Sequence, residues 1–318
     1  MKKVIIITIL FISIIGVINI FSPNIKCEGA ESSILYVGGS VEGNFISIQD
    51  AIDTANRGDT IYVYSGIYEE YIYINKTINL IGEDKNKTII RGNGEGSVLF
   101  ITTELEGLRN NIFADYVNVS GFTIDNGAFG IKVNSNYNSI TNNIIKNNGG
   151  GIYLIASKYN VVSGNTIINN EWNGISFHYS NDSTISGNTI SNSEIGMIFV
   201  DSSNNNIIYH NNLINNFQNA NDSENNLWYN TILKEGNYWD DYNGTDANAD
   251  GIGDTQYAIP GGYNVDEYPL MIPINESLEK EEFIVDYESV FTMLVIGIII
   301  SIIFVLPIAY YWRKKYFL

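Results

Sequence analysis

Cysteine and histidine are scarce in this chain, with one cysteine and two histidines among 318 residues. The single cysteine, Cys27, lies next to an export segment and is expected to be removed with it, so the mature chain has no disulfide. Copper centres need clustered imidazole, thiolate or thioether ligands. Because this sequence supplies so few of them, copper is not expected as a cofactor.

Basic residues are also few, with 17 Lys and Arg against 35 Asp and Glu. Six of the basic residues lie in the two terminal segments, so the region between them is more acidic still: Lys2, Lys3, Lys26, Arg313, Lys314 and Lys315. An acidic surface of this kind repels phosphate backbones. The composition therefore argues against a nucleic-acid partner and favours divalent cations.

Long apolar runs stand near the two ends of the chain. Residues 1–30 start with two lysines and continue as an apolar run, which predicts a signal peptide or an N-terminal anchor. A second run, residues 290–312, is long enough to span a bilayer, and the basic tail at 313–318 is expected in the cytoplasm. Residues 31–289 should then lie outside the cell, with an acidic stalk at 274–289.

Export gives a chain access to glycosylation. Seven Asn-x-Ser/Thr sequons occur here: Asn75, Asn86, Asn118, Asn181, Asn221, Asn243 and Asn275. An asparagine-rich chain contains some sequons by chance, and we expect several of these to be glycosylated.

The middle of the chain repeats with a period of 21 to 23 residues. One motif, typified by Val-Ser-Gly-Asn-Thr-Ile, ends on an apolar residue once per repeat: Ile124, Ile145, Ile167, Ile190 and Leu213. A second motif begins with glycine at Gly130, Gly151, Gly174 and Gly196. Each repeat holds short alternating apolar stretches between Asn and Gly, and no segment of helical periodicity.

A coil of this length has room for three short strands and three turns. Coils stacked roughly 4.8 Å apart pair each strand with its copies above and below. We therefore predict an all-β fold, a single-stranded right-handed parallel β-helix over residues 31–235. Four asparagines share one register position, where we expect a structural ladder along the axis: Asn143, Asn165, Asn188 and Asn211.

The second motif also predicts which side chains face the core. Ile152, Ile175 and Phe177 should point inward, whereas Tyr153 and Ser176 should face outward.

The amino-terminal part fits the same fold. Residues 47–55 carry apolar side chains at helical spacing, which predicts a short amphipathic helix that covers the open first coil. The first strands are expected at residues 59–64, 71–75, 78–81 and 88–90.

Several segments resemble a known family. The runs Ser47–Ile52, Gly58–Tyr64 and Ile74–Gly82, together with the coils above, resemble the NosD-type β-helix proteins. The segment at 236–273 resembles the tail that closes many of them, especially on archaeal cell surfaces. The resemblance spans about residues 35–273 and implies the fold. The family name implies a role in copper-site maturation, and the wider group includes carbohydrate-binding proteins and sugar hydrolases.

The two histidines do not suggest the copper role. His178 aligns with Val200, whereas His210 aligns with Gly187, so the two imidazoles fall on different columns of the solenoid. A lyase is also poorly supported, because the few basic residues of the coils have no acidic cluster beside them.

A glycoside hydrolase needs two carboxylates within reach of one glycosidic bond. Glu171 and Glu194 occupy nearly equivalent turns of neighbouring coils, with Trp172 adjacent as a sugar platform, and Asp201 aligns with Tyr179. These are the best catalytic candidates, although acidic side chains in solvated turns are common in so acidic a chain.

The strongest local motif is the loop Asp246–Asp254. Its oxygen ligands fall at positions one, three, five, seven and nine of an EF-hand-like loop: Asp246, Asn248, Asp250, the carbonyl of Ile252, and Asp254. Gly251 stands at position six, where a sharp turn is needed. Position twelve is Tyr257 instead of the usual glutamate. We expect calcium, with further ligands from Asp240, Asp241 or water.

The sequence as a whole favours a membrane-anchored surface protein that binds extracellular glycans or envelope proteins, with calcium bracing the closing segment. A polysaccharide hydrolase or lyase is the first alternative, and a copper-maturation factor is the second.

Overall fold

The computed structural model describes residues 32–103 and 114–274 of the chain. The predicted export segment, the predicted membrane span at 290–312 and the basic tail lie outside the described residues. Within the described ranges, no helix is both long and apolar enough to cross a membrane.

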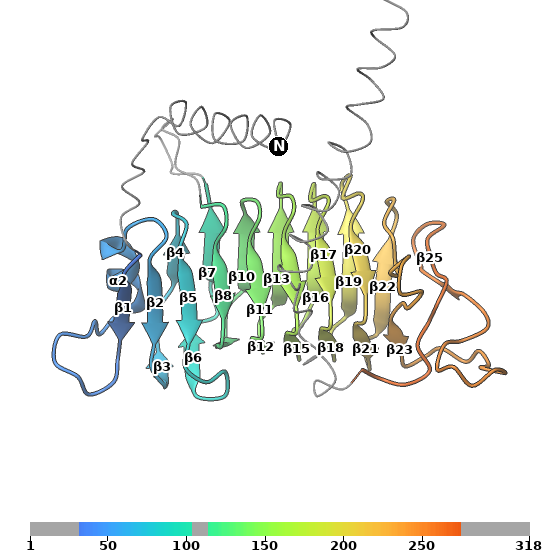
Figure 1. Ribbon diagram of the computed structural model, residues 1–318, viewed down its shortest axis with the longest axis horizontal. Helices are drawn as coiled ribbons and strands as arrows, with labels where there is room; N and C mark the ends of the chain where they lie inside the picture. Colours follow the sequence, from blue (N-terminus) through green and yellow to red (C-terminus); the bar gives the residue numbers. More distant parts are fainter. Residues whose placement is uncertain (1–31, 104–113, 275–318) are drawn as a thin grey trace, which may run out of the picture. The chain divides into compact units, whose positions relative to one another are not determined.

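Each coil of the repeat contributes one strand to each of three parallel sheets (Figure 1). Sheet 1 contains β1 (Ile34–Val37), β2 (Thr60–Val63), β5 (Asn79–Gly82), β8 (Asn118–Ser120), β11 (Ser139–Thr141), β14 (Val161–Ser163), β17 (Thr184–Ser186) and β20 (Ile207–Tyr209). Sheet 2 contains β3 (Gly66–Tyr68), β6 (Thr88–Arg91), β9 (Thr123–Asp125), β12 (Ile144–Lys146), β15 (Thr166–Ile168), β18 (Thr189–Ser191), β21 (Asn212–Ile214) and β23 (Tyr238–Trp239). Sheet 3 contains β4 (Ile72–Ile74), β7 (Ser97–Thr102), β10 (Phe129–Asn134), β13 (Gly150–Ile155), β16 (Asn173–His178), β19 (Ile195–Val200) and β22 (Gln218–Asp222). The predicted right-handed parallel β-helix is confirmed.

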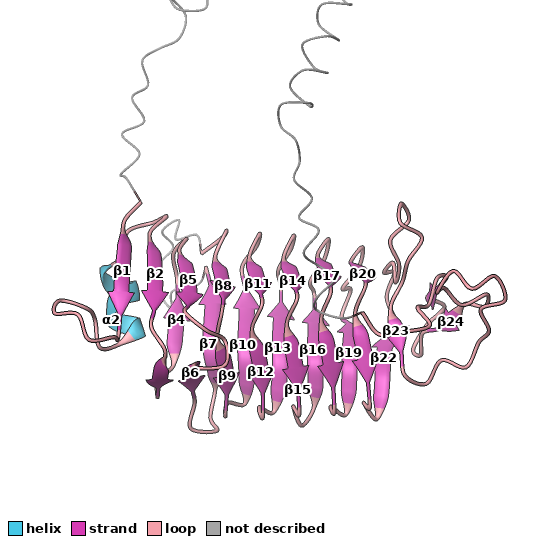
Figure 2. Ribbon diagram, turned by 60° about the horizontal axis from the view of Figure 1, so that its bottom comes forward, coloured by secondary structure: helices cyan, strands magenta, loops and turns pink. Residues whose placement is uncertain are grey.

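The strands expected near the amino terminus are present as β2, β4, β5 and β6, while β1, β3 and β7 were not foreseen. Helix α2 (Ile48–Thr54) begins after Ser47, whose side chain accepts a hydrogen bond from the Asp50 backbone N–H. Its buried residues pack beside β1, β2 and β4 (Figure 2).

The core is built from identical positions stacked coil upon coil. In sheet 3, Ile152 pairs with Ile175 and Ile175 with Met197, and all three are buried. Phe177 and Phe199 lie one column over, with their rings stacked at 4.4 Å. The register predicted for this sheet is therefore confirmed, because apolar side chains alternate inward along each strand.

Ser176 departs from the expectation in one respect. It pairs with Tyr153 and Ile198 in the outward column, as the register requires. Its side chain is nevertheless only 3% exposed. Large neighbours on the outer face, where the Tyr153 ring stacks on Phe129 at 4.9 Å, leave little solvent around so small a side chain. Ser176 is thus outward but covered.

Tight turns between the sheets require residues with positive φ. Asn147, Asn169, Asn192 and Asn215 occupy equivalent turns between sheets 2 and 3, with φ of 55°, 56°, 56° and 55°. Asparagine tolerates this left-handed conformation better than most residues. The asparagine richness of the sequence therefore reflects turn geometry as well as side-chain hydrogen bonding.

Buried asparagines form the predicted ladder between sheets 1 and 2. The backbone N–H and Nδ2 of Asn165 both donate to Asn188 Oδ1 at 3.0 Å, and Asn188 donates in the same way to Asn211 at 3.0 and 2.9 Å. A parallel ladder between sheets 3 and 1 contains Asn138, Asn160, Ser183, Asn206 and Asn226. Each coil is thereby held to the next by side-chain bonds that run along the axis.

Both ladders end on buried aspartates in the closing segment. In the ladder between sheets 1 and 2, the last asparagine is Asn237, and its backbone N–H donates to Asp266. In the ladder between sheets 3 and 1, the last asparagine is Asn226, and its Nδ2 donates to Asp222. A buried tryptophan completes each end, because Trp239 Nε1 donates to Asp266 at 2.9 Å and Trp228 Nε1 donates to Asp222 at 2.8 Å. A carboxylate suits this position because it accepts from donors that have no further coil to bond.

The first part of the closing segment adds one more strand to the solenoid, and the rest folds outside the regular coils. Strand β23 pairs in parallel with β21, so the regular coils extend beyond the predicted boundary at residue 235. A small antiparallel pair, β24 (Tyr257–Ala258) and β25 (Val265–Asp266), follows. The Tyr257 ring stacks on Trp239 at 4.1 Å and covers the last coil.

Candidate functional site

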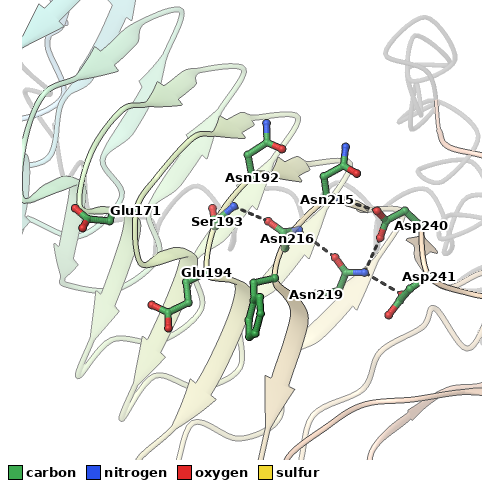
Figure 3. Close-up of a pocket in the computed structure, with 10 residues that line it drawn as sticks. Glu171, Asn192, Ser193, Glu194, Asn215, Asn216, Asn219, Asp240 and Asp241 are labelled. Atoms are coloured by element: carbon green, nitrogen blue, oxygen red, sulfur yellow. Dashed lines mark hydrogen bonds between the residues drawn. The ribbon is translucent and has the colours of Figure 1, made fainter.

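A groove runs along the turns that join sheet 2 to sheet 3. One cleft of about 830 Å³ is lined by Glu171, Asn192, Ser193, Glu194, Asn215, Asn216, Phe217, Asn219, Asp240 and Asp241 (Figure 3). A second cleft of about 560 Å³ lies toward earlier coils, and both clefts share Glu171 and Asn192. They form one elongated depression across successive coils, which we call the turn groove.

The turn groove brings together two of the three carboxylates proposed for catalysis. Glu171 and Glu194 lie on successive coils at its wall, as their equivalent turns predicted (Figure 3). Both side chains are exposed. Asp201 does not join them, because its Oδ2 lies 2.8 Å from His178 Nδ1 at the opposite end of the sheet 3 strands.

Aromatic side chains stand beside these carboxylates. Trp172, 43% exposed, packs edge-to-face on Phe129 with ring centroids 5.8 Å apart. A Cβ atom at Gly149 would come within 2.9 Å of its indole, so only glycine at this position leaves room for the ring where it lies. Phe217 lines the groove two coils further on and is 91% exposed. The packed indole of Trp172 and the exposed ring of Phe217 thus lie beside the two glutamates.

The carboxyl-terminal wall of the groove is fixed by hydrogen bonds. Asn219 Nδ2 donates to Asp240 Oδ1 at 2.8 Å and to Asp241 Oδ1 at 2.9 Å (Figure 3). The Tyr257 hydroxyl donates to Asp241 Oδ2 at 3.1 Å. Burial, together with the Asp241 charge, raises the pKa of Tyr257, so its hydroxyl remains a donor. Asp240 and Asp241 were not proposed as groove residues from the sequence, because they come from the closing segment, outside the repeat. Phe217 belongs to a regular coil and was not proposed either.

The loop Asp246–Asp254 is closed by its own hydrogen bonds. Asp246 accepts from the backbone N–H groups of Asp250 and Gly251, and Asp254 accepts from that of Ala247. Gly251 has a φ of +86°, as the predicted sharp turn requires. Asn248 Nδ2 donates to Asp250 at 2.8 Å, and the Ile252 N–H donates to the same carboxylate at 2.9 Å.

The sequence profile of the family described as "Periplasmic copper-binding protein (NosD)" matches residues 52–244, which include every coil that forms the turn groove. The chain belongs to the NosD family. No curated protein matches this NosD-family chain.

Several solved structures are similar in fold. A Geobacillus virus E2 protein, ORF18, is 15% identical with a TM-score of 0.45, and the match covers 52% of this chain and 38% of the viral chain. Pectin methylesterase from carrot is 12% identical with a TM-score of 0.37, over 61% of this chain and 69% of that enzyme. An alginate lyase from a Paenibacillus species is 15% identical with a TM-score of 0.31, over 64% and 97%.

The residues of this NosD-family chain do not fit a copper centre. Among the described residues, no group of three or more His, Cys, Asp and Glu side chains is placed to hold a metal ion. His178 bonds to Asp201, and His210 Nε2 lies 2.6 Å from Glu235 Oε2. The two imidazoles belong to different columns, as the alignment of the repeats predicted, and Met197 is fully buried.

Proposed function

We propose that this NosD-family chain is an exported protein that binds a glycan along the turn groove. The observation that supports this most directly is the groove itself, which crosses successive coils and combines exposed aromatic rings with carboxylates and amides. A linear polymer of sugars has repeating hydroxyl groups and apolar C–H faces. A binding surface that repeats every 4.8 Å or so along its length complements such a polymer.

The two aromatic residues supply the apolar part of the proposed site. Large exposed aromatic side chains beside polar groups are typical of binding surfaces. Trp172 is held by Phe129 and Gly149, so it loses little conformational freedom when a ligand packs on it. Phe217 offers a second contact across the acidic wall.

The test is a glycan array probed with the full-length chain purified in detergent, followed by titration with the best glycan. Trp172→Ala combined with Phe217→Ala should abolish binding. Tyr263→Ala is the matched control, because Tyr263 is also a fully exposed aromatic but does not line the groove. Failure of the whole array to retain the protein would refute glycan binding.

The alternative of a carbohydrate-active enzyme is favoured by one observation, the placement of Glu171 and Glu194 on the same groove wall. Two carboxylates on one site are the minimum for glycoside hydrolysis. Incubation of the retained glycan with the protein separates the two functions. New reducing ends or unsaturated products would overturn simple binding, and retention without turnover supports it.

The two terminal segments suggest where in the cell this site lies. We propose that residues 290–312 anchor the chain in the membrane, that the solenoid lies outside the cell, and that α2 covers the first coil. Envelope proteins are then further partners of the same surface. Protease added to intact cells should remove the solenoid and leave a short membrane stub. A solenoid that stays protected would contradict this topology.

We also propose that calcium binds the loop Asp246–Asp254. Carboxylate and carbonyl oxygens suit calcium, and three aspartates within nine residues repel one another unless a cation lies between them. In the structure the three carboxylates are not placed together to hold a metal ion, and they bond instead to backbone N–H groups of the loop. Calcium must therefore compete with those bonds and draw the carboxylates together. Millimolar affinity, as in other extracellular loops, is expected.

A further inference from the structure

Two rows of exposed side chains border the turn groove and follow the axis of the solenoid. One row consists of asparagine amides from four successive coils, which we call the asparagine row: Asn147, Asn169, Asn192 and Asn215. The acidic wall stands opposite, with Glu171 and Glu194 and the aromatic side chains beside them. Figure 3 shows Asn192 and Asn215 on one side of the groove and the two glutamates on the other. The groove therefore offers polar groups along both of its edges.

The asparagine row repeats with the spacing of the coils. Its members occupy equivalent turns, and Asn192 Nδ2 donates to Asn169 Oδ1 at 3.0 Å. Neighbouring strands lie about 4.8 Å apart, so the four amides span roughly 14 Å. Before the row, Asn126 Nδ2 is turned to the Gly92 carbonyl at 2.8 Å. After it comes the closing segment, where Asp240 accepts from the backbone N–H of Asn215 at 2.6 Å.

Buried side chains form the floor between the two rows. The backbone N–H and Nδ2 of Asn148 both donate to Asn170 Oδ1 at 3.1 Å, and Ser193 takes this position in the next coil. The Ser193 hydroxyl has no hydrogen-bond partner among the described residues, whereas that of Ser183, in the ladder between sheets 3 and 1, donates to a backbone carbonyl at 3.1 Å. Because these floor atoms are buried, a ligand in the groove meets the two exposed rows instead.

Trp172 is an additional residue in its turn. The inward residues of sheets 2 and 3 lie seven positions apart from Ile190 to Met197, but eight positions apart from Ile167 to Ile175. The extra position falls in the turn, at Trp172, because the strand that follows is again in register with the next coil. An inserted residue breaks the regular stacking and re-aims a side chain. The insertion thus places an exposed indole at the acidic wall, where the other coils have no tryptophan.

We propose that the turn groove binds an uncharged, extended glycan of the β-1,4-linked type, which lies parallel to the solenoid axis with one sugar unit on each coil. This inference rests on the proposed glycan-binding function and names its ligand class. A β-1,4-linked chain of hexoses is a nearly straight ribbon with hydroxyl groups along both edges. Each unit advances the ribbon by about one coil spacing, or roughly 4.8 Å.

The two rows complement the two edges of such a ribbon. The amides of the asparagine row both donate and accept hydrogen bonds, so they suit sugar hydroxyl groups in either role. The carboxylates of Glu171 and Glu194 accept only, and hydrogen bonds from hydroxyl groups to a charged acceptor are strong. The Trp172 indole provides an apolar surface for the C–H face of one sugar unit.

Charge and shape argue against two other classes of glycan. Carboxylates line the clefts, and none of the lining residues is Lys, Arg or His, so uronic acids and sulfated sugars are repelled. An α-1,4-linked chain of the same hexoses curves into a helix. It therefore contacts one or two amides of the straight asparagine row and then turns away from it.

The binding experiment compares two uncharged probes that differ only in their linkage. The full-length chain, in a detergent without a sugar head group, is titrated calorimetrically with a β-1,4-linked glucose hexamer and with the α-1,4-linked glucose hexamer. The β-linked hexamer should bind at least about tenfold more tightly, because it reaches two or more amides that the curved chain misses. In a series of β-linked oligomers, affinity should rise at each step from the dimer to the tetramer and then level off, because the row has four amides.

Every other outcome counts against the proposal. Equal affinity for the two hexamers, tighter binding of the α-linked hexamer, or an affinity that stops rising at the dimer overturns the inference and leaves glycan binding intact. The same holds if neither hexamer binds while another glycan of the array does. If no glycan of the array binds, the proposed function itself fails.

Glycine substitutions test the asparagine row without straining the turns. Asn192 lines both clefts and has a φ of 56°, which glycine adopts readily. Asn192→Gly should weaken binding of the β-linked hexamer about three- to tenfold, as expected for the loss of one hydrogen bond. Asn142→Gly is the matched control, because Asn142 is also exposed, has a φ of 53° and lies in a turn between sheets 1 and 2, where the next two coils have Gly164 and Gly187. The control should bind like the natural chain, and equal affinity of the two variants contradicts the contact with the asparagine row.

Discussion

The asparagine ladder predicts that a near-isosteric change of one buried amide to a carboxylate will destabilise the solenoid. Asn188 is fully buried. Its Nδ2 donates to the carbonyls of Val162 and Ser186 and to Asn211 Oδ1 at 2.8, 3.1 and 2.9 Å, while its Oδ1 accepts both donors of Asn165. The amide thus acts as donor on one side and acceptor on the other.

Asn188→Asp keeps the acceptor and removes the donors. The three oxygens that accepted from Asn188 Nδ2 then face a buried carboxylate and lose this donor. Each buried acceptor left without a donor lowers the free energy of unfolding by about 1–3 kcal/mol. Three such groups amount to at least about 3 kcal/mol, and the buried charge adds to this, so we expect the free energy of unfolding at pH 7 to fall by more than about 3 kcal/mol. At pH 4 part of this loss should be recovered, because a protonated carboxyl group is neutral and donates one hydrogen bond.

Denaturant unfolding at both pH values, followed by circular dichroism, measures the effect. Asn169→Asp is the matched control: this side chain is exposed, it accepts from Asn192 Nδ2 at 3.0 Å, and aspartate also tolerates its positive φ. The control should lie within about 0.5 kcal/mol of the natural chain. If Asn188→Asp is as stable as Asn169→Asp, the ladder does not hold the coils together and the reasoning is wrong.

Three further predictions follow from the same structure. Ile175→Asp buries an unpaired charge in the core and should lower the free energy of unfolding, measured with denaturant, by several kcal/mol. Ser163→Asp, at a partly exposed outward position, should lower it little, and equal losses in the two variants would mean that the register is wrong. Millimolar calcium should raise the melting temperature of the natural chain but not of Asp250→Ala, and identical melting of both proteins with and without calcium would eliminate the site. Burial raises the pKa of Asp266 from 3.8 to about 6, so the folded chain holds a proton that the unfolded chain has lost, and stability falls as pH rises from about 4 to 6. Relative to Asp266→Asn, the natural chain should lose roughly 3 kcal/mol over that window, and parallel pH profiles would show that Asp266 does not titrate in this way.

The repeat in the sequence is sufficient to predict the fold. A period of 21 to 23 residues with alternating apolar stretches allows one efficient way to bury those residues, which is to stack identical strands. The inward positions of Ile152, Ile175 and Phe177 followed from alternation, and the ladder through Asn188 followed from its constant place in the repeat. Local periodicity determines these features because each coil contacts only its neighbours.

The turn groove depended on features that no periodicity encodes. Glu171 and Glu194 were paired from their equivalent turns, but Asp240 and Asp241 reach the same wall only because the closing segment folds back onto the last coils. Ser176 was placed on the correct face, yet its burial depends on large side chains from neighbouring coils.

Ser193 is the clearest case of the difference. The sequence shows a serine where its neighbours in the column have asparagine, and Ser183 shows the same substitution elsewhere. Whether such a hydroxyl is bonded or free depends on differences of a few tenths of an ångström in how two coils meet, to which hydrogen bonding is sensitive. The sequence alone therefore determined the solenoid and its ladders, while only the tertiary structure decided which hydroxyl is left unpaired beside the groove.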